Sequence, residues 1–506
     1  MNEAIPTIPR ETWVRIRAAL PKNLEIYLVG GAVRDIFLGR ATHDLDFALV
    51  KEARKAARSA AAALDTPYYT LDEERDTGRV ILNQPDGVRL FLDFAVLRGT
   101  DLVSDLQDRD FTINAMAIAL DRPDRLIDPL GGANDLREGV IRACSVTAFR
   151  NDPVRILRAV RQAVEFGFHI QSETRSLIGE ALPLLPSVSA ERLRDELFRI
   201  LEGPQPATAL RALDILGVLP YVLPELPALK GIVQPLPHVA DVWEHSLGVA
   251  QKLSSILKVL AVEHDPETAA NLSLALISVC LGRFRKPLHD HHSKSLNPDR
   301  SLRGLVLLAA LYHDVGKAET HEIEAEGRIR FRQHEFSGER LVSKRAHALH
   351  LSNGEIARLK AIVRGHMRPL LLAQTGEKPS RRAVYRFFRD TGEAGVDICL
   401  LSLADTLATY GPALPQDVWS GQLDVVRTLL EAYWEQKDER ISPPPLLTGH
   451  DLIEMLKYQP GPGIGKMLDA LREAQAAGEI TNREQALEFA RRNLEDHEDL
   501  TGSKQG

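Results

Sequence analysis

Residues 30–47 read GGAVRDIFLGRATHDLDF, and this stretch decides what the N-terminal region can be. An apolar run of β type, Ile26–Val29, ends at Gly30-Gly31, and a helical pattern follows. Two glycines after a strand let the backbone approach a phosphate closely, and the N-terminus of the next helix offers free N–H donors. Taken alone, a glycine pair of this kind is weak evidence for a binding site.

The acidic residues that follow sharpen this prediction. Asp44 and Asp46 are two residues apart in the strand-like run Asp44–Val50, so both carboxylates should lie on one face. Two like charges that close repel each other unless a divalent cation lies between them. Asp93 lies inside a second strand-like run, Leu90–Leu97, where an unpaired acid is costly. Three acids on neighbouring strands suit Mg²⁺-dependent phosphoryl transfer from a nucleotide. Solvated strand-edge acids are the alternative interpretation.

Five motifs, in order, resemble those of the bacterial-type (class II) tRNA nucleotidyltransferases and the related bacterial poly(A) polymerases. They are Gly30–Phe47, Arg109–Met116 (RDFTINAM), Asp128–Gly132 followed by Asp135-Leu136, Asn151–Arg155 (NDPVR) and Glu191–Glu196 (ERLRDE). The resemblance implies an α+β fold, with a polymerase-β-like nucleotidyltransferase head built on a mixed sheet and helical domains after it. It also implies template-independent addition of CCA to tRNA 3′ ends from CTP and ATP, with Mg²⁺ as cofactor and release of pyrophosphate.

The same resemblance assigns roles to individual residues. It makes Asp44 and Asp46 the catalytic metal ligands, with Asp93 as a third catalytic acid. The nucleotide would be bound by residues from three of the motifs and the helix after Asn151–Arg155, namely Gly30, Gly31, Arg34, Arg109, Asp110, Asn114, Asp152, Arg155 and Arg158.

Asp152 and Arg155 would select the base. Asp152-Pro153 has the pattern of a helix N-cap followed by proline, which would place Asp152 and Arg155 on one helix face. Such a pair offers one acceptor and a fork of donors to a base edge. An ordinary surface ion pair is the alternative. The motifs also depart from the family pattern, because Asn151 replaces a glutamate and Asp108 replaces an arginine. Addition of CC alone, A alone or poly(A) therefore stays open.

A second group of residues, in the order H…HD…H…H…D, predicts a metal site in the middle of the chain. Its members are His245, His313, Asp314, His334, His366 and Asp405. Imidazoles with carboxylates suit Mn²⁺, Ni²⁺ or Mg²⁺ better than Ca²⁺, and a bound ion would activate water for attack on a phosphoester. The order resembles the HD superfamily of metal-dependent phosphohydrolases, which implies phosphatase or 2′,3′-cyclic phosphodiesterase activity. His238 is either a further substrate contact or a loop residue.

Four domains are expected from these patterns. They are a head at 1–140, a helical neck that binds RNA and nucleotide at 141–235, an HD domain at 236–420 and a C-terminal helical tail at 421–506. Residues 283–300, with His289, His291 and His292, are polar and are interpreted as an exposed loop. The tail contains a glycine-rich turn before Lys466 that would hold an RNA phosphate or simply join two helices.

Composition limits the remaining possibilities. The 506 residues include 63 Lys+Arg and 70 Asp+Glu, a net charge of −7, which excludes a uniformly basic nucleic-acid coat but allows a local basic groove. Three scattered cysteines indicate reduced thiols and a cytoplasmic protein. No apolar run approaches the ~20 residues that span a bilayer, so no membrane partner is expected. A phosphohydrolase whose head only binds RNA is the alternative of another class, and the sequence does not indicate the oligomeric state.

Overall fold

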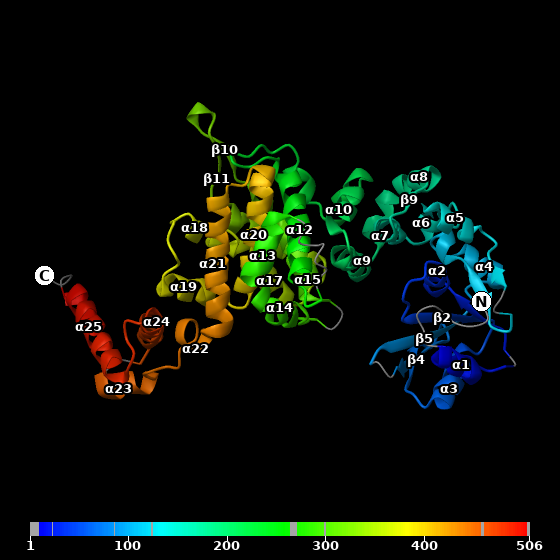
Figure 1. Cartoon of the computed structure of the whole chain (residues 1–506), viewed down its shortest axis with the longest axis horizontal. Helices are drawn as coiled ribbons and strands as arrows, with labels where there is room; N and C mark the ends of the chain where they lie inside the picture. The colour runs from blue at the N-terminus through cyan, green and yellow to red at the C-terminus, as the bar shows by residue number, and fades with distance from the viewer. Residues whose placement is uncertain are drawn as a thin grey trace. The chain divides into compact units, whose positions relative to one another are not determined.

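The computed structural model describes residues 10–22, 24–84, 87–122, 125–263, 271–297, 300–456 and 460–502. The chain forms two compact units (Figure 1). One consists of Met1–Leu197 and Ala212–Val222, and the other of Phe198–Arg211 and Leu223–Gly506.

A mixed seven-stranded sheet forms the centre of the head, in the order β3-β4-β5-β2-β1-β6-β7. The strands are β1 Ile26–Val29, β2 Asp44–Leu49, β3 Tyr68–Asp72, β4 Thr77–Asn83, β5 Arg89–Val96, β6 Ala117–Ala119 and β7 Leu126–Ile127. The β2–β5 pair is parallel and its neighbours in the sheet are antiparallel. The expected α+β head with a mixed sheet is therefore confirmed.

Strand β2 shows the alternation that its sequence predicts. Leu45, Phe47 and Leu49 are buried on one face, where Phe47 stacks on Phe94 with ring centroids 5.0 Å apart. The other face carries both acids of the motif. Helix α3 (Ala53–Leu64) contacts β4 and β5 through an alanine-rich stripe whose members are fully buried. Small side chains let this helix pack closely, which holds β5 and its acid beside β2. The remaining head helices are α1 Arg10–Ala19, α2 Gly31–Phe37, α4 Leu102–Gln107 and α5 Gly132–Glu138.

The neck that follows is helical, with one short parallel pair of strands, β8 Val140–Ile141 and β9 His169–Ile170. Its helices are α6 Ala148–Asn151, α7 Arg155–Phe166, α8 Ser172–Ala181, α9 Ala190–Glu202, α10 Pro206–Ile215 and α11 Leu219–Val222. Helix α7 begins at Arg155, three residues after Asp152. The backbone of Asp152 is extended, at φ −150° and ψ 92°, as in a helix-capping residue and in a residue before proline. Its carbonyl accepts a hydrogen bond of 3.1 Å from the N–H of Arg155, so the Asp152-Pro153 pattern lies directly before the helix.

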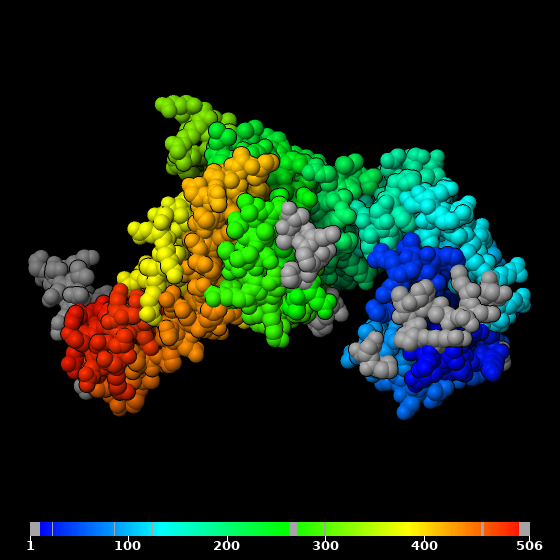
Figure 2. All heavy atoms as spheres, viewed as in Figure 1, coloured from blue at the N-terminus to red at the C-terminus, as the bar shows by residue number. Residues whose placement is uncertain are grey.

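The second unit is a helical body with a C-terminal tail. The body contains α12 Val242–Val259, α13 Leu272–Leu281, α14 Arg285–His292, α15 Leu302–Tyr312, α16 His334–Ala348, α17 Asn353–Gly365, α18 Arg368–Ala373, α19 Arg381–Thr391, α20 Ala394–Tyr410 and α21 Gln416–Glu435. A hairpin of β10 (His321–Ile323) and β11 (Ile329–Phe331) projects from this body (Figures 1 and 2). Helices α15 and α20 form its core, because nearly every residue of both is buried.

The segment 283–300, expected to be an exposed loop, contains helix α14 at Arg285–His292. His291 is buried, and its Nε2 lies 3.0 Å from a carboxylate oxygen of Asp397 on α20. The Nε of Arg358 donates to the other oxygen of Asp397 at 2.6 Å. The polar residues of α14 are thus partners of a buried acid, a long-range pairing that a local polarity pattern cannot reveal.

The tail packs into a small core of its own, made by Leu452, Leu471, Ala486 and Ala490 among others. Its helices are α22 Lys437–Arg440, α23 Gly449–Leu456, α24 Pro462–Ala477 and α25 Arg483–Gly502. Lys466 lies inside the first turns of α24. Among the described helices, none is long and apolar enough to cross a bilayer.

Candidate active sites

The acids of the head lie side by side on the central strands. Asp46 on β2 and Asp93 on β5 are direct register partners in the parallel pair, and Asp44 is exposed at the start of β2. Burial raises the pKa of Asp46, and the neighbouring carboxylates of Asp93 and Asp44 raise it further, against the lowering effect of Arg109. A divalent cation at this edge would relieve that repulsion.

Asp93 has a partner of its own within the sheet. Arg79 on β4 is the register partner of Asp93, and its Nε and Nη2 donate to the two carboxylate oxygens at 2.7 and 2.6 Å. In this bidentate pair the guanidinium charge of Arg79 compensates the carboxylate charge of Asp93 without a metal. A metal-ligand role for Asp93 therefore stays a prediction, and Arg79 would have to release the carboxylate first.

The backbone at Gly30 lies close to the carboxylate of Asp46. Its backbone has φ +76°, and a Cβ there would lie 2.9 Å from Nη1 of Arg109 and 3.1 Å from Oδ2 of Asp46. Glycine is required both for that conformation and for that closeness. Gly31 begins helix α2, and Arg109 is held by two hydrogen bonds, of 3.1 and 3.0 Å, from its guanidinium to Asp105. A positive side chain and the helix start thus face the acidic strand edge.

Four of the predicted nucleotide-binding residues form one connected network. Nη1 of Arg34 donates to Oδ1 of Asn114 at 2.7 Å, and Nδ2 of Asn114 donates to Asp110 at 2.9 Å. Nε and Nη2 of Arg158 donate to the other oxygen of Asp110 at 2.9 and 2.7 Å. Burial raises the pKa of Asp110, but Arg158 and the hydrogen bond from Asn114 outweigh that effect and hold it below its ordinary value.

Arg158→Ala is expected to destabilise the unit by about 3 kcal/mol, because it leaves the buried Asp110 carboxylate without its cation. Arg150→Ala is the matched control, since Arg150 forms an exposed pair with Glu180 and its loss should cost no more than about 1 kcal/mol. Urea unfolding followed by circular dichroism measures both. The loss should be largest near neutral pH and shrink once acid protonates Asp110, because a depressed pKa stabilises only above it. Equal effects of the two variants would contradict the assignment.

Arg155 differs from what the sequence predicts. Its guanidinium is buried and donates to three main-chain carbonyls, of Asp108 at 2.7 Å, Arg109 at 3.1 Å and Ala148 at 3.3 Å. Its Nε is 3.9 Å from Oδ2 of Asp152, so the two are not a paired fork on one helix face. Arg155 therefore ties the RDFTINAM segment to the neck, and direct reading of a base by it stays a prediction.

Asp152 is better placed to meet a base. Its Oδ2 accepts a hydrogen bond of 2.8 Å from Arg192 of the ERLRDE motif on α9. Its Oδ1 is buried and has no hydrogen-bond partner among the described residues. A buried acceptor without a donor is unfavourable in the free protein and suits an incoming amino group. Arg192 was not among the predicted site residues, although its motif was recognised.

The second unit brings all six residues of the H…HD…H…H…D pattern together around Asp314. Nε2 of His313 and of His245 lie 3.3 and 3.7 Å from its Oδ2. Nε2 of His334 and of His366 lie 3.3 and 3.6 Å from its Oδ1. Asp405 completes the first side, 3.1 Å from Nε2 of His245. Asp314 thus faces two groups of potential ligands, one near each oxygen, and each group could hold a divalent cation that would activate water.

Backbone carbonyls orient these imidazoles. Nδ1 of His313, His334 and His366 lies 2.7, 3.0 and 2.7 Å from the carbonyls of Ala310, Phe331 and Val363. A carbonyl can only accept, so each Nδ1 carries a hydrogen, and in the neutral imidazole that binds a metal the Nε2 then presents the lone pair. The Nε2 of His245 and of His313 are buried without a hydrogen-bond donor among the described residues. The donor set therefore fits a divalent transition metal ion.

The charged groups around Asp314 stabilise its ionised carboxylate. Burial raises its pKa, yet His313 and Lys317 together hold that pKa well below its ordinary value. The ammonium of Lys317 is 2.6 Å from Oδ2 of Asp314 and donates to Gln234 at 2.7 Å. His238 lies at the same site, with its ring centroid 5.2 Å from that of His245. Burial, Lys317 and His245 lower the pKa of His238 to about 4, so it is neutral at pH 7.

Comparison with known proteins gives four family matches in chain order. They are the poly A polymerase head domain at 26–142, the probable RNA and SrmB-binding site of polymerase A at 167–229, the HD domain at 242–410 and a putative tRNA nucleotidyltransferase domain 2 at 430–490. An A-adding tRNA nucleotidyltransferase of Deinococcus radiodurans is 32% identical over 93% of this chain and 95% of its own length. A CC-adding tRNA nucleotidyltransferase of Geobacter sulfurreducens is 30% identical over 92% and 90%.

Solved structures share the fold. A CCA-adding enzyme in complex with ATP matches with a TM-score of 0.62, at 21% identity, over 96% of both chains. The Thermotoga maritima CCA-adding enzyme complexed with tRNA matches with a TM-score of 0.55, at 21% identity and the same coverage.

Proposed function

We propose that this chain, which belongs to the tRNA nucleotidyltransferase family, adds the CCA sequence to tRNA 3′ ends from CTP and ATP without a nucleic-acid template. The observation that carries this proposal is the edge of β2 and β5, where Asp44 and Asp46 lie on one face of β2 and Asp46 lies beside the Gly30 turn and the Arg109 side chain. Phosphoryl transfer from a triphosphate needs acids that hold metal ions and a cation near the phosphates. It also needs a backbone segment that the phosphates can approach closely.

The side chains of the head would then divide the work. Asp44 and Asp46 would hold Mg²⁺, which when bound activates the tRNA 3′-hydroxyl and stabilises the charge on the leaving pyrophosphate. Arg109 and the start of α2 would attract the triphosphate. Asn114 lies within hydrogen-bonding distance of Arg34, and the pair would orient the ribose and phosphates. The Asp110–Arg158 pair fixes this network in one geometry before the nucleotide arrives.

Addition of only CC or only A is the second candidate, and the near full-length relatives favour it, since they are A-adding and CC-adding enzymes. The experiment that decides uses three tRNA substrates, ending at the discriminator base, after CC and after CCA, each with labelled CTP or ATP. Complete CCA addition requires CTP incorporation on the first substrate and ATP incorporation on the second. An enzyme that uses only one of these two substrates is a specialised one.

Asp152→Ala is expected to alter the choice between CTP and ATP by about tenfold to a hundredfold. Cytosine and adenine each carry an exocyclic amino group, and the unpaired Oδ1 of Asp152 would accept from it. A lost hydrogen bond to a base edge changes selectivity by that amount. The measurement is kcat/KM for CTP and for ATP on matched tRNA ends, with Asp195→Ala, a more exposed acid on α9, as control. Unchanged ratios would remove Asp152 from base selection.

We also propose that the HD domain is a metal-dependent phosphohydrolase that removes a phosphate or opens a 2′,3′-cyclic phosphate at an RNA 3′ end. The support is the convergence of four Nε2 lone pairs on both oxygens of Asp314. Mn²⁺, Ni²⁺ or Mg²⁺ would supply a water of lowered pKa there. Lys317, once cations displace it from Asp314, would be free to attract the substrate phosphate.

The division into head, neck, HD domain and tail at 1–140, 141–235, 236–420 and 421–506 is part of the same proposal, and the four family matches in that order support it. A cytoplasmic location is proposed on the same footing. The cysteines Cys144, Cys280 and Cys399 are all unpaired, which is compatible with a reducing compartment.

A further inference from the structure

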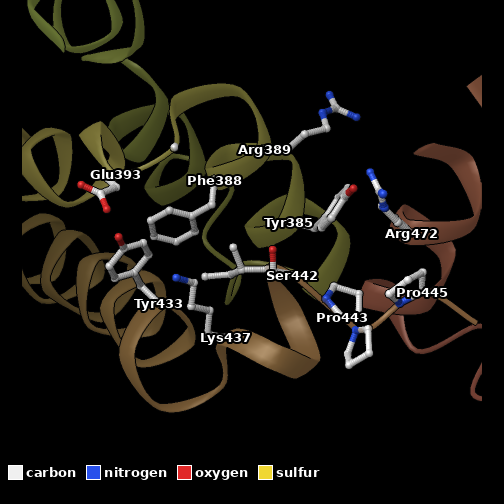
Figure 3. A pocket seen from close by; sticks show the side chains of 13 residues that line it. Tyr385, Phe388, Arg389, Glu393, Tyr433, Lys437, Ser442, Pro443, Pro445 and Arg472 are labelled. Atoms are coloured by element: carbon white, nitrogen blue, oxygen red, sulfur yellow. The ribbon is translucent and has the colours of Figure 1, made fainter. Parts of the chain in front are cut away.

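A pocket of about 610 Å³ lies where the helical body meets the tail, and none of its lining residues belongs to either site described above. Its walls come from α19, the end of α21, α22, the segment 441–445 and α24 (Figure 3). The volume is in the range of sites that take a small organic ligand. All of these elements belong to the second unit.

One wall of the pocket is aromatic. The rings of Phe388 and Tyr433 have centroids 5.1 Å apart and planes inclined by 30°, so they pack against each other, and the partly exposed Tyr433 ring lines the pocket. Phe388 is 3% exposed, which fixes its ring, and Tyr385 on the same helix contributes a third ring further along the pocket (Figure 3). Flat aromatic surfaces of this kind stack with nucleobases whatever their sequence.

Charges are distributed along the length of the pocket. Glu393 lies near Tyr433, whereas Arg472 lies near Tyr385, toward the other end (Figure 3). The ammonium of Lys437 is 5.7 Å from the centre of the Tyr433 ring. Arg389 points away from the pocket, and its Nη1 donates to Glu473 at 3.0 Å, so its guanidinium does not face a ligand in the pocket. The pocket thus offers an acid beside its aromatic wall and cations for an anion.

Residues behind the pocket hold Glu393 in place. Nη1 of Arg358 lies 3.7 Å from its Oε2, and the ammonium of Lys294 lies 3.8 Å from its Oε1. Arg358 is itself fixed by its hydrogen bond to the buried Asp397. The two cations fix the position of the Glu393 carboxylate, and its side chain is still 54% exposed.

We propose that this pocket binds a nucleotide whose base carries an exocyclic amino group, adenine or cytosine. The base would stack on Tyr433, whose ring Phe388 supports, and donate its amino group to Glu393, and the phosphate would lie against Lys437 and Arg472. The nucleotide is either free or an unpaired nucleotide of bound RNA, since both present the same chemistry. The proposal does not depend on catalysis by the head, because it concerns binding to residues 385–472 alone.

The test is equilibrium binding of AMP and IMP to the full-length protein in EDTA, which removes Mg²⁺-dependent triphosphate binding. IMP differs from AMP in lacking the amino group. Wild type should bind AMP about tenfold more tightly than IMP, and Glu393→Gln should reduce that preference. Tyr433→Ala should weaken AMP about tenfold or more, whereas Tyr433→Phe keeps the ring and should bind normally. Tyr221→Ala, at a tyrosine outside the pocket, is the control.

Competition with tRNA distinguishes the two sources. Displacement of AMP by tRNA, lost in Tyr433→Ala, identifies an RNA nucleotide as the occupant, and AMP binding that tRNA leaves unchanged identifies a free one. The proposal is overturned if wild type binds no AMP, or if Tyr433→Ala binds AMP normally. It is also overturned if Asp152→Ala, in the head, abolishes AMP binding while Tyr433→Ala does not.

Discussion

Asp44→Ala and Asp46→Ala each reduce nucleotide incorporation by about 10³-fold or more, and the folded state persists. Each acid is a predicted metal ligand, and the charge stabilisation lost with the metal amounts to several kcal/mol in the transition state. Stability should hold or rise slightly, because burial and the neighbouring acids raise the pKa of Asp46 and removing one carboxylate relieves that repulsion. The measurement is single-turnover incorporation of labelled CTP into truncated tRNA at saturating Mg²⁺, with thermal unfolding in parallel.

Asp121→Ala is the matched control for these variants, because Asp121 is an exposed acid of the head that lies next to Arg122. It should incorporate CTP at the wild-type rate. Wild-type incorporation by either Asp44→Ala or Asp46→Ala would contradict metal binding by the two acids.

His313→Ala combined with Asp314→Ala removes bound transition metal and any phosphohydrolase activity. The Asp314 carboxylate faces both groups of imidazoles, so its loss should empty both positions. Nucleotide addition to an intact 3′-hydroxyl should stay near the wild-type rate, since the head residues lie in the other unit. The measurement combines metal analysis with assays on RNA ending in a hydroxyl, a phosphate or a 2′,3′-cyclic phosphate.

His347→Ala serves as its control, because His347 is exposed and its Nδ1 contacts only the carbonyl of Ser343 within α16. It should retain the metal. If wild-type protein carries no metal and opens no cyclic phosphate with Ni²⁺, Mn²⁺ or Mg²⁺, the domain has a structural role only. Loss of nucleotide addition in the folded double variant would show instead that the two sites are coupled.

Short-range patterns predicted the central parts of both sites. The two-residue spacing of Asp44 and Asp46 determines which face of a strand they occupy, and the structure has both on the face opposite Leu45 and Phe47. The six HD residues lie within or at the ends of five different helices, and their chain order was sufficient to group them because it resembles a known pattern. Local geometry and order of this kind are properties of the sequence itself.

Long-range partners were not predictable in the same way. Arg79 meets Asp93 only because β4 and β5 pair in one particular register, and nothing in Thr77–Asn83 marks that residue. The same is true of Lys317 with Gln234, and of His291 with Asp397 across three helices. The bonds from Arg155 to main-chain carbonyls were not predictable for a related reason, since only tertiary packing brings those carbonyls near. Pairings between distant segments require the fold.

The most direct test of the account is sequencing of tRNA 3′ ends after incubation of the purified protein with tRNA ending at the discriminator base, CTP, ATP and Mg²⁺. If the protein adds CCA, we expect products that end in CCA and extend no further. A ladder of added adenosines, or no extension at all, would contradict it.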